Sequence, residues 1–470
     1  MYGKSKIPLT LWIILIIILV LIFLWSPNIL ISIPLLLYIP FVYKLFFIKG
    51  NLNVLFWGLL YQWLTISIQA FYCSVMGISL NDLFVNSVFP AKLMEYTGFL
   101  SVIGVYSFTL GIYLALKRTK IIVLEKIWES YDPKRILSTY VIVSIVISVN
   151  QIAIWNFPGL VQYFYFFFYI KWGFFLVAFT AVFKRAPHLK IFLYSIIAFE
   201  FVLGLSSFFA SSFTYILLFS LIAYSSINQK ISYQKGVLFL IMGVVLFHMA
   251  VLWTAAKGNY RTYVNQGKGT QTVTVSQEEA RNKLLELIVQ IDDVTYTKAL
   301  EDVINRIGYL QYFAAAVRFV PAKVPFEDGK IYAAAIGHYL VPRFINPDKA
   351  ELDDSKHTNQ YTGLGLSGRN RGTSFSLGSF ADAYIDFGPT FMYIPIFLFG
   401  FLIGHFYRYL YRPNIWGLIF TGPFFLLINI FGADTAKALG FILIYFIVMA
   451  VLNKRIVKLV DPMMRARVKK

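Results

Sequence analysis

Runs of about twenty apolar residues recur along almost the whole chain, and they constrain its fold more than any other feature. An α-helix of that length crosses the hydrocarbon core of a bilayer, which is roughly 30 Å thick. Only 14% of the 470 residues are charged, whereas the surface of a water-soluble protein needs about a quarter. The sequence therefore predicts an all-α, polytopic membrane protein.

About twelve transmembrane helices are predicted, each bounded by turn-forming residues or charged connections. They lie near residues 7–25, 29–48, 53–76, 96–116, 136–155, 158–183, 190–207, 211–228, 234–254, 387–407, 414–431 and 436–453. Lysine and arginine concentrate in alternate connections and in the tail after the last helix. Because basic residues favour the cytoplasmic side, both termini are expected in the cytoplasm. The first run lacks a small-residue cleavage pattern, so we expect it to remain as a helix.

Residues 254–386 form one long polar segment, which the predicted orientation places outside the cytoplasm. This segment holds 15 basic and 15 acidic residues, so the formal net charge of +19 arises in the short inner connections and the tail. Inner loops and anionic lipid headgroups account for that charge better than a nucleic acid partner does. We divide the chain into nine helices in residues 1–253, an external domain in 254–386, three helices in 387–453 and a basic cytoplasmic tail in 454–470.

The external segment is predicted to be partly helical. Ser276 and Glu279 have the spacing of a capping box, in which two side chains satisfy free N–H groups at a helix start. A second amphipathic helix is expected over residues 297–319, ending at Pro321. The stretches 258–269 and 349–371 are expected to form loops.

No motif of a nucleophilic or metal-dependent enzyme occurs in the sequence. The H-E-x-x-H, G-x-S-x-G and P-loop patterns are absent, and the five histidines are dispersed. Cys73 is the single cysteine, which excludes an internal disulfide. Asp353 and Asp354 come nearest to a site for a hard cation, but such a pair in a polar loop is more often solvated. We predict neither a metal ion nor a cofactor.

Three arginines of the external segment suit a phosphate ligand, because a guanidinium stays charged and offers a planar fork to phosphate oxygens. Arg343 follows Pro342, and Arg369 and Arg371 lie in a glycine-rich stretch, 363–372. Backbone N–H groups in such a stretch can approach an anion closely. Alternatively, these arginines form ion pairs with acidic residues of the same segment, which are as numerous as its basic residues.

Two ionisable residues fall inside predicted helices. Lys171 lies near the middle of 158–183, and Glu200 lies near the middle of 190–207. A charge is costly in hydrocarbon, so both side chains are expected to face the protein interior and to pair with each other. Such a pair would act as a structural lock or would take part in handling a substrate.

A series of short motifs occupies the second half of the external segment. They are Arg306, Val320-Pro321, a turn over 325–329, VPRFINPDK at 341–349, and GTS followed by ADAYIDFG between 372 and 388. This order resembles bacterial oligosaccharide repeat-unit polymerases, the O-antigen and capsule polymerases of the Wzy-dependent pathway. The resemblance covers residues 300–400. The family pattern has glutamate where this chain has Asp382, and commonly asparagine where it has Asp386.

The resemblance implies a metal-independent glycosyltransferase of the GT-C type in the bacterial cytoplasmic membrane. Such an enzyme joins repeat units carried by undecaprenyl pyrophosphate, with one lipid-linked glycan as donor and another as acceptor. A chain-length regulator and a flippase are its expected partners. The resemblance further implies that pyrophosphate is bound by Arg306, Arg343, Arg369 and Arg371, with Arg343 stabilising the leaving charge during catalysis. His338 or Asp382 would be the base, and the choice between them stays open.

Two other classes of function share these features. A ligase of the same superfamily transfers a glycan to a different acceptor and uses the same arginine chemistry. A lipid-linked oligosaccharide flippase or transporter would also have many spans and buried charges. It does not usually need a polar external segment of this length.

Overall fold

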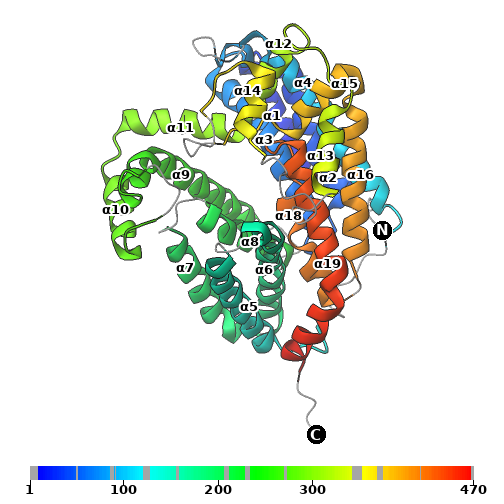
Figure 1. Ribbon diagram of the computed structural model, residues 1–470. Helices are drawn as coiled ribbons and strands as arrows, with labels where there is room; N and C mark the ends of the chain where they lie inside the picture. The colour runs from blue at the N-terminus through cyan, green and yellow to red at the C-terminus, as the bar shows by residue number, and fades with distance from the viewer. Residues whose placement is uncertain are drawn as a thin grey trace.

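The computed structural model describes residues 9–48, 51–84, 89, 91–119, 128–154, 158–205, 211–227, 233–268, 273–340, 352–367, 374–412 and 414–466. Within these residues every regular element is a helix, and β pairing is limited to a single bridge between Tyr131 and Arg465. The predicted all-α class is therefore confirmed for the part of the chain that the structure describes (Figure 1).

The helices follow the apolar runs closely. Before the polar segment they are α1 (Leu9–Trp25), α2 (Ile29–Phe46), α3 (Val54–Met76), α4 (Met94–Leu116), α5 (Pro133–Ile154), α6 (Pro158–Arg185), α7 (Lys190–Leu205), α8 (Ser211–Ile227) and α9 (Tyr233–Val264). The polar segment contains α10 (Gln277–Val289), α11 (Asp293–Gly308), α12 (Leu310–Phe319), α13 (Lys330–Leu340) and α14 (Asp354–Thr362). The remaining helices are α15 (Ser379–Phe391), α16 (Tyr393–Leu410), α17 (Ile415–Thr421), α18 (Phe424–Leu427) and α19 (Thr435–Met464).

Six segments of the described chain are long and apolar enough to cross a membrane. They are Ile29–Phe46, Val54–Met76, Met94–Leu116, Pro187–Gly204, Tyr393–Leu410 and Thr435–Met464. The chain is therefore a multi-pass membrane protein. Large apolar side chains such as Ile16 of α1 and Phe199 of α7 are exposed, as expected for helix faces that contact lipid.

Glycines allow two of the candidate spans, α4 and α16, to pack closely. A Cβ atom at Gly111 would lie 2.2 Å from the backbone oxygen of Phe397, and one at Gly400 would lie 2.2 Å from that of Phe108. Small residues are typical of helix contacts in membranes, where close packing replaces the hydrophobic drive that water would supply. This contact is what a membrane helix pair is expected to show.

The prediction of one continuous helix over residues 414–431 is wrong. Two short helices, α17 and α18, take its place, with Gly422 and Pro423 between them. Proline has no N–H group with which to continue a helix. At Gly422 a Cβ atom would lie 2.7 Å from the Cα atom of Gly173 in α6. Hydropathy predicts one helix here, but proline and close packing against α6 favour a break.

Residues 428–434 are not helical, although they lie among apolar helices. Gln62 of α3 is fully buried. Its Oε1 atom accepts the N–H groups of Ile430 and Phe431 at 2.8 Å and 3.2 Å. Buried backbone donors need such partners where water is excluded. A single polar side chain of α3 therefore supports the non-helical turn directly before α19.

The polar segment is more helical than the sequence indicates. Ser276 and Glu279 form the predicted capping box. The helix predicted over 297–319 is instead two helices, α11 and α12, which are separated by Tyr309 in a left-handed conformation. Residues 354–362 form α14 where a loop is expected, and α9 continues to Val264.

Figure 1 shows how these helices are arranged. Helices α5 to α8 lie on one side of the molecule, and α2, α16 and α19 lie on the other. Helices α12, α14 and α15 gather at the end opposite the C-terminus, and α19 runs from the interior toward the C-terminal end. Contacts of α6 with α17 and α19 join the two sides.

The predicted pair of buried charges is confirmed. Lys171 Nζ lies 2.7 Å from Glu200 Oε2, and the two side chains are 17% and 15% exposed. Tyr140 donates its hydroxyl to Glu200 Oε1 at 2.5 Å. The Lys171 ammonium also lies 5.3 Å from the ring centre of Trp172. Helices α5, α6 and α7 therefore meet at one neutralised charge pair, which favours its interpretation as a structural lock.

Removing one charge of this pair should destabilise the protein more than removing both. Glu200→Leu leaves the Lys171 ammonium without a counter-ion, and breaking a buried pair in this way costs about 3–5 kcal/mol. The double variant Lys171→Met, Glu200→Leu should recover most of that loss, because no charge remains buried. Thermal unfolding in detergent measures the difference, with Lys454→Met at an exposed position as the control. Equal losses in the single and double variants would contradict the lock.

Candidate functional site

The residues predicted to form the site are spread over the structure. Three of them lie outside the described residues: Arg343, Arg369 and Arg371. Arg306 is exposed in the last turn of α11, and His338 is partly exposed in the last turn of α13. Asp382 is fully buried in α15. Its contacts define the site described below.

A glycine and a serine start α15. Gly378 has a φ angle of 96°, in the left-handed region that glycine adopts readily. A Cβ atom there would lie 2.1 Å from the backbone oxygen of Phe431. Ser379 donates its N–H to the carbonyl of Ile430 at 3.3 Å and its hydroxyl to the carbonyl of Ala433 at 2.7 Å. These contacts fasten the start of α15 to the non-helical turn before α19.

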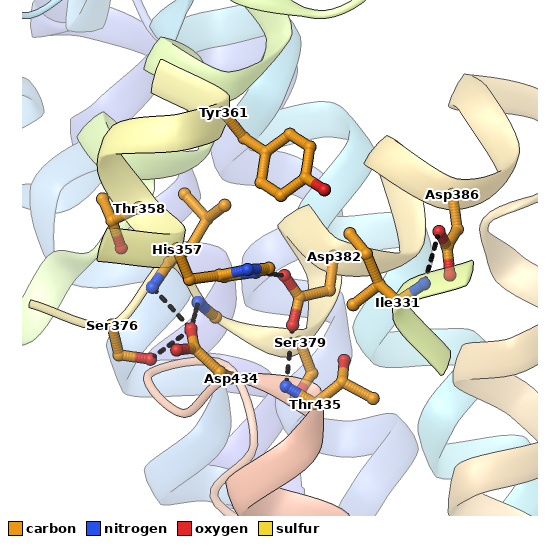
Figure 2. Close-up of polar contacts among 12 residues, drawn as sticks. Ile331, His357, Thr358, Tyr361, Ser376, Ser379, Asp382, Asp386, Asp434 and Thr435 are labelled. Carbon is orange, nitrogen blue, oxygen red and sulfur yellow. Dashed lines mark hydrogen bonds and ion pairs between the residues drawn. The ribbon is translucent and has the colours of Figure 1, made fainter. Parts of the chain in front are cut away.

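Asp382 forms a hydrogen-bonded pair with His357 of α14 (Figure 2). The Oδ1 atom of Asp382 lies 2.7 Å from His357 Nε2, and its Oδ2 atom accepts the N–H of Thr435 at 2.7 Å. Thr435 is the first residue of α19, and a helix N-terminus favours negative charge. The side chains of His357 and Asp382 are 25% and 1% exposed. The imidazole is therefore the part of the pair that a ligand can reach.

Asp434 lies directly before α19 and is held by three donors. Its Oδ1 atom accepts the hydroxyl of Ser376 at 2.8 Å and the N–H groups of Leu377 and Gly378 at 2.7 Å and 3.1 Å. Burial and, next, the charge of Asp382 raise the pKa of Asp434 to about 7. A carboxyl group that titrates near neutrality is suited to exchange a proton in the cell.

Asp354 of α14 and Lys437 of α19 lie next to these residues. We call the group of His357, Asp382, Asp434, Asp354 and Lys437 the His357 cluster. Asp354 Oδ2 accepts the hydroxyl of Ser374 at 2.6 Å and forms an ion pair with Lys437. Three carboxyl groups therefore share this site with one lysine and one histidine.

The carboxyl groups determine the charge of His357. Burial disfavours the imidazolium, but the Asp382 carboxylate, assisted by Asp434 and Asp354, outweighs burial and raises the pKa of His357 to about 9. At neutral pH the residue is therefore an imidazolium. It donates a hydrogen bond to Asp382 and keeps a positive charge next to the surface.

The same cluster has the spacing of a metal site. The ligand atoms of His357, Asp382 and Asp434 lie within 4.8 Å of one another, and a set of imidazole and carboxylate ligands suits several divalent ions. A metal ion requires the neutral imidazole, so the proton on His357 competes with it. One oxygen each of Asp382 and Asp434 also accepts backbone N–H groups. Proton and metal are alternative occupants, and these hydrogen bonds favour the proton.

Asp386 has a structural role at the start of another helix. Its two carboxylate oxygens accept the N–H groups of Ile331 and Tyr332 at 3.1 Å and 2.9 Å, in the first turn of α13. Figure 2 shows the contact with Ile331. Free N–H groups at a helix start need acceptors and favour negative charge. The second acidic residue of the motif therefore ties α13 to α15.

Three cations gather between α9 and α11. Lys257 and Arg261 are one turn apart on α9, and Arg306 is on α11. Burial and the charge of Arg306 lower the pKa of Lys257 to about 8, and the same two causes lower the pKa of Arg261. Burial raises the pKa of Tyr309. The charges of Arg306 and of two carboxyl groups of the His357 cluster, Asp434 and Asp354, also act on this pKa. Tyr309 therefore links the cations to the cluster.

Sequence reasoning missed His357, Asp434 and Lys437. The available signal was spacing: Asp354 and His357 are three residues apart, as are Asp434 and Lys437, which places each pair on one helix face. A charged residue at the end of an apolar run is normally expected to lie in solvent. Only the folded chain shows that these two helix starts meet.

Stability should fall as the pH rises through the pKa of His357. This pKa is raised from 6.5 to about 9 in the folded protein, so the proton favours folding. The contribution is fully present below pH 6.5 and is lost as the pH passes through about 9. Asp434 acts in the same direction but over a lower range, because its raised pKa is about 7.

Thermal unfolding in detergent between about pH 7 and pH 10 measures this effect. The melting temperature of the wild type should decline over that range, and His357→Gln should flatten the decline. His188→Gln, at an exposed position, is the matched control. A decline of the same slope in His357→Gln and the wild type would refute the raised pKa.

No curated protein and no solved structure matches the chain. A family model described as a domain of unknown function (DUF8712) matches residues 66–431. That range contains His357 and Asp382 and ends in the turn before Asp434. Because the family model matches most of the length of the chain, the chain belongs to this family, the domain of unknown function DUF8712.

Proposed function

We propose that this protein is a metal-independent membrane glycosyltransferase that polymerises undecaprenyl-pyrophosphate-linked oligosaccharide repeat units. The observation that carries the proposal is the reachable imidazolium of His357, held on the buried carboxylate of Asp382. The cations of α9 and α11 and the motif order of residues 300–400 support it. About twelve spans, with both termini in the cytoplasm, would put the His357 cluster on the external face of a bacterial cytoplasmic membrane.

The reaction needs a group that stabilises the departing pyrophosphate. An acceptor hydroxyl attacks the anomeric carbon of the donor glycan, the bond from that carbon to the phosphate oxygen breaks, and the hydroxyl proton passes to a base. With a pKa of about 9, only about 1% of His357 is neutral at pH 7. His357 therefore suits the leaving group, to which the imidazolium donates a hydrogen bond, better than it suits the role of base.

Asp434 is the best candidate for the base within the described residues. Its pKa of about 7 is close to the working pH, where a general base is most effective. Its three hydrogen bonds in the part of the chain that the structure describes all go to Oδ1. Asp434 is 6% exposed, so an acceptor hydroxyl would have to enter beside His357 to reach Oδ2. Asp382 has hydrogen bonds at both oxygens, which favours a positioning role. His338 stays an alternative base.

The cations nearby suit the pyrophosphate of the lipid carrier. Lys257 and Arg261 are both repelled by Arg306, and Asp302 offsets part of this repulsion at Lys257. A phosphate anion between α9 and α11 would relieve the rest. Arg343, Arg369 and Arg371 are proposed as further ligands of the pyrophosphate. Fixed cations of this kind act where negative charge develops in the transition state.

Purified protein in liposomes that contain only the lipid-linked repeat unit should produce a ladder of chain lengths. His357→Gln should lower the rate by about 10²–10⁴-fold, as expected for loss of a proton-donating group, while His188→Gln should not. EDTA should leave the wild-type rate unchanged, because His357 and Lys437 already counter the carboxylates.

The other functional classes predict different outcomes of the same experiment. Transfer solely to a different acceptor would indicate a ligase. Relocation of the lipid without any glycan product would indicate a flippase. Either outcome would replace the proposal of a polymerase.

The predicted arginines can be tested in cells that lack the native gene. Arg343→Ala and Arg371→Ala each remove a charged partner of the pyrophosphate, so each should lower polymer formation by about 10- to 100-fold. Arg281→Ala on α10 is the control. The chain-length distribution is measured at matched protein levels, and normal long chains from both variants would remove these arginines from the mechanism.

A further inference from the structure

The hydroxyl of Tyr361 connects the His357 cluster to the turn over residues 325–329, which has no role in the reaction described above. Tyr361 donates this hydroxyl to Glu327 Oε1 at 3.2 Å. The N–H of Glu327 in turn donates to the carbonyl of Ile385 in α15 at 3.0 Å. The turn is therefore fastened to the same helix that carries Asp382.

Tyr361 also packs against the imidazole of His357 (Figure 2). The two residues lie four positions apart in α14, so their side chains project from the same face of the helix. Their ring centres are 5.1 Å apart and the ring planes cross at 69°, which is a favourable edge-to-face arrangement. The imidazole is therefore in contact with Asp382 through Nε2 and with the ring of Tyr361.

Helix α14 depends on such contacts for its position. It has nine residues, and a helix of this length is not stable in isolation. Asp354 connects its first turn to Lys437 of α19, and Tyr361 connects its last turn to Glu327. His357 lies between these two connections, so both limit how far the imidazole can move.

The hydrogen bond from Tyr361 persists at neutral pH. Burial and, next, the charge of Glu327 raise the pKa of Tyr361, so the phenol keeps its proton and remains a donor. A carboxylate acceptor also forms a stronger hydrogen bond than a neutral group.

We propose that Tyr361 and Glu327 are positioning residues, which hold His357 on Asp382 so that the other ring nitrogen, Nδ1, meets the leaving phosphate. This inference rests on the proposed function, because it takes the His357 imidazolium as the donor to the leaving group. Tyr361 and Glu327 act on the rate only through the orientation of the imidazole. A displacement of about 1 Å at a catalytic group can lower a rate by about 100-fold.

NMR of the purified full-length protein with isotope-labelled histidine tests the proposal without turnover. The signal of the His357 Nε2–H group is assigned by its loss in His357→Gln. Its proton should exchange slowly with water in the wild type, because its acceptor Asp382 is buried. Tyr361→Leu removes the ring and the hydroxyl, so the imidazole should leave Asp382 more often and the exchange should become at least about tenfold faster. Tyr409→Leu, at an exposed position on α16, should not change it.

Polymer formation in the liposome assay should follow the same order. Tyr361→Leu should lower its rate by about 10- to 100-fold, because the imidazole is no longer fixed. Glu327→Ala should lower it by about two- to tenfold, the effect of one hydrogen bond. Glu327→Gln should retain most of the rate, because its amide oxygen still accepts the Tyr361 hydroxyl.

A double variant tests whether Glu327 acts through the hydroxyl of Tyr361. Glu327→Ala should have no further effect in the Tyr361→Phe background, where that hydroxyl is already absent. Lys330→Met is the matched control, because it removes the ion pair of Glu327 and keeps the hydrogen bond with Tyr361. Independent effects of the two substitutions would refute the positioning role of Glu327.

Melting temperatures separate positioning from stability. A lower melting temperature of Tyr361→Leu without faster exchange at His357 would make Tyr361 a structural residue and overturn the proposal. If Tyr361→Leu does not fold, Tyr361→Phe and Glu327→Ala provide the same test. Faster exchange without a polymer ladder from the wild type supports the positioning of His357 and refutes the polymerase. A ladder that depends on His357 but is unchanged in Tyr361→Leu refutes only the positioning role.

Discussion

The site depends on an exchange of hydrogen bonds between two helix starts. Asp434, before α19, accepts N–H groups of Leu377 and Gly378 from the chain before α15. Asp382, in the first turn of α15, accepts the N–H of Thr435 at the start of α19. Each segment thus supplies a carboxylate to the free backbone donors of the other. Buried carboxyl groups are tolerated here because helix starts offer donors and favour negative charge.

The charge of His357 follows from this exchange. Burial alone would keep the imidazole neutral, but the carboxyl groups held at the two helix starts raise its pKa to about 9. The site therefore presents a fixed cation at the surface above buried acids. Tyr309 lies within electrostatic range of both Arg306 and two carboxyl groups of the cluster. Such an arrangement is suited to an anionic ligand more than to a neutral one.

The apolar bundle contains the polar side chains needed to support this geometry. Gln62 satisfies the turn before α19, so the last long helix can begin at the cluster. Lys171 and Glu200 neutralise each other between α6 and α7. Both devices obey the rule that polar groups away from water must find partners inside the protein.

The candidate site was predictable only in part. Asp382 was singled out by its motif, and the pairing of Lys171 with Glu200 followed from the high cost of an isolated charge in hydrocarbon. The local signal at His357 is its spacing from Asp354, which does not reveal the contact with Asp382, because Asp382 lies on a helix start that is distant in sequence. The role of Asp386 as a cap for α13 likewise depends on a contact between separate segments.

The sequence by itself determined the helical class, the apolar segments and the capping box at Ser276, because periodicity, hydropathy and capping act over a few neighbouring residues. Pro423 disfavours a continuous helix over 414–431, and the tertiary packing of Gly422 against Gly173 contributes to the break at this point. Tertiary structure alone decided which histidine meets Asp382 and how strongly that histidine holds its proton. These properties arise from the burial and separation of charges, which only the folded chain defines.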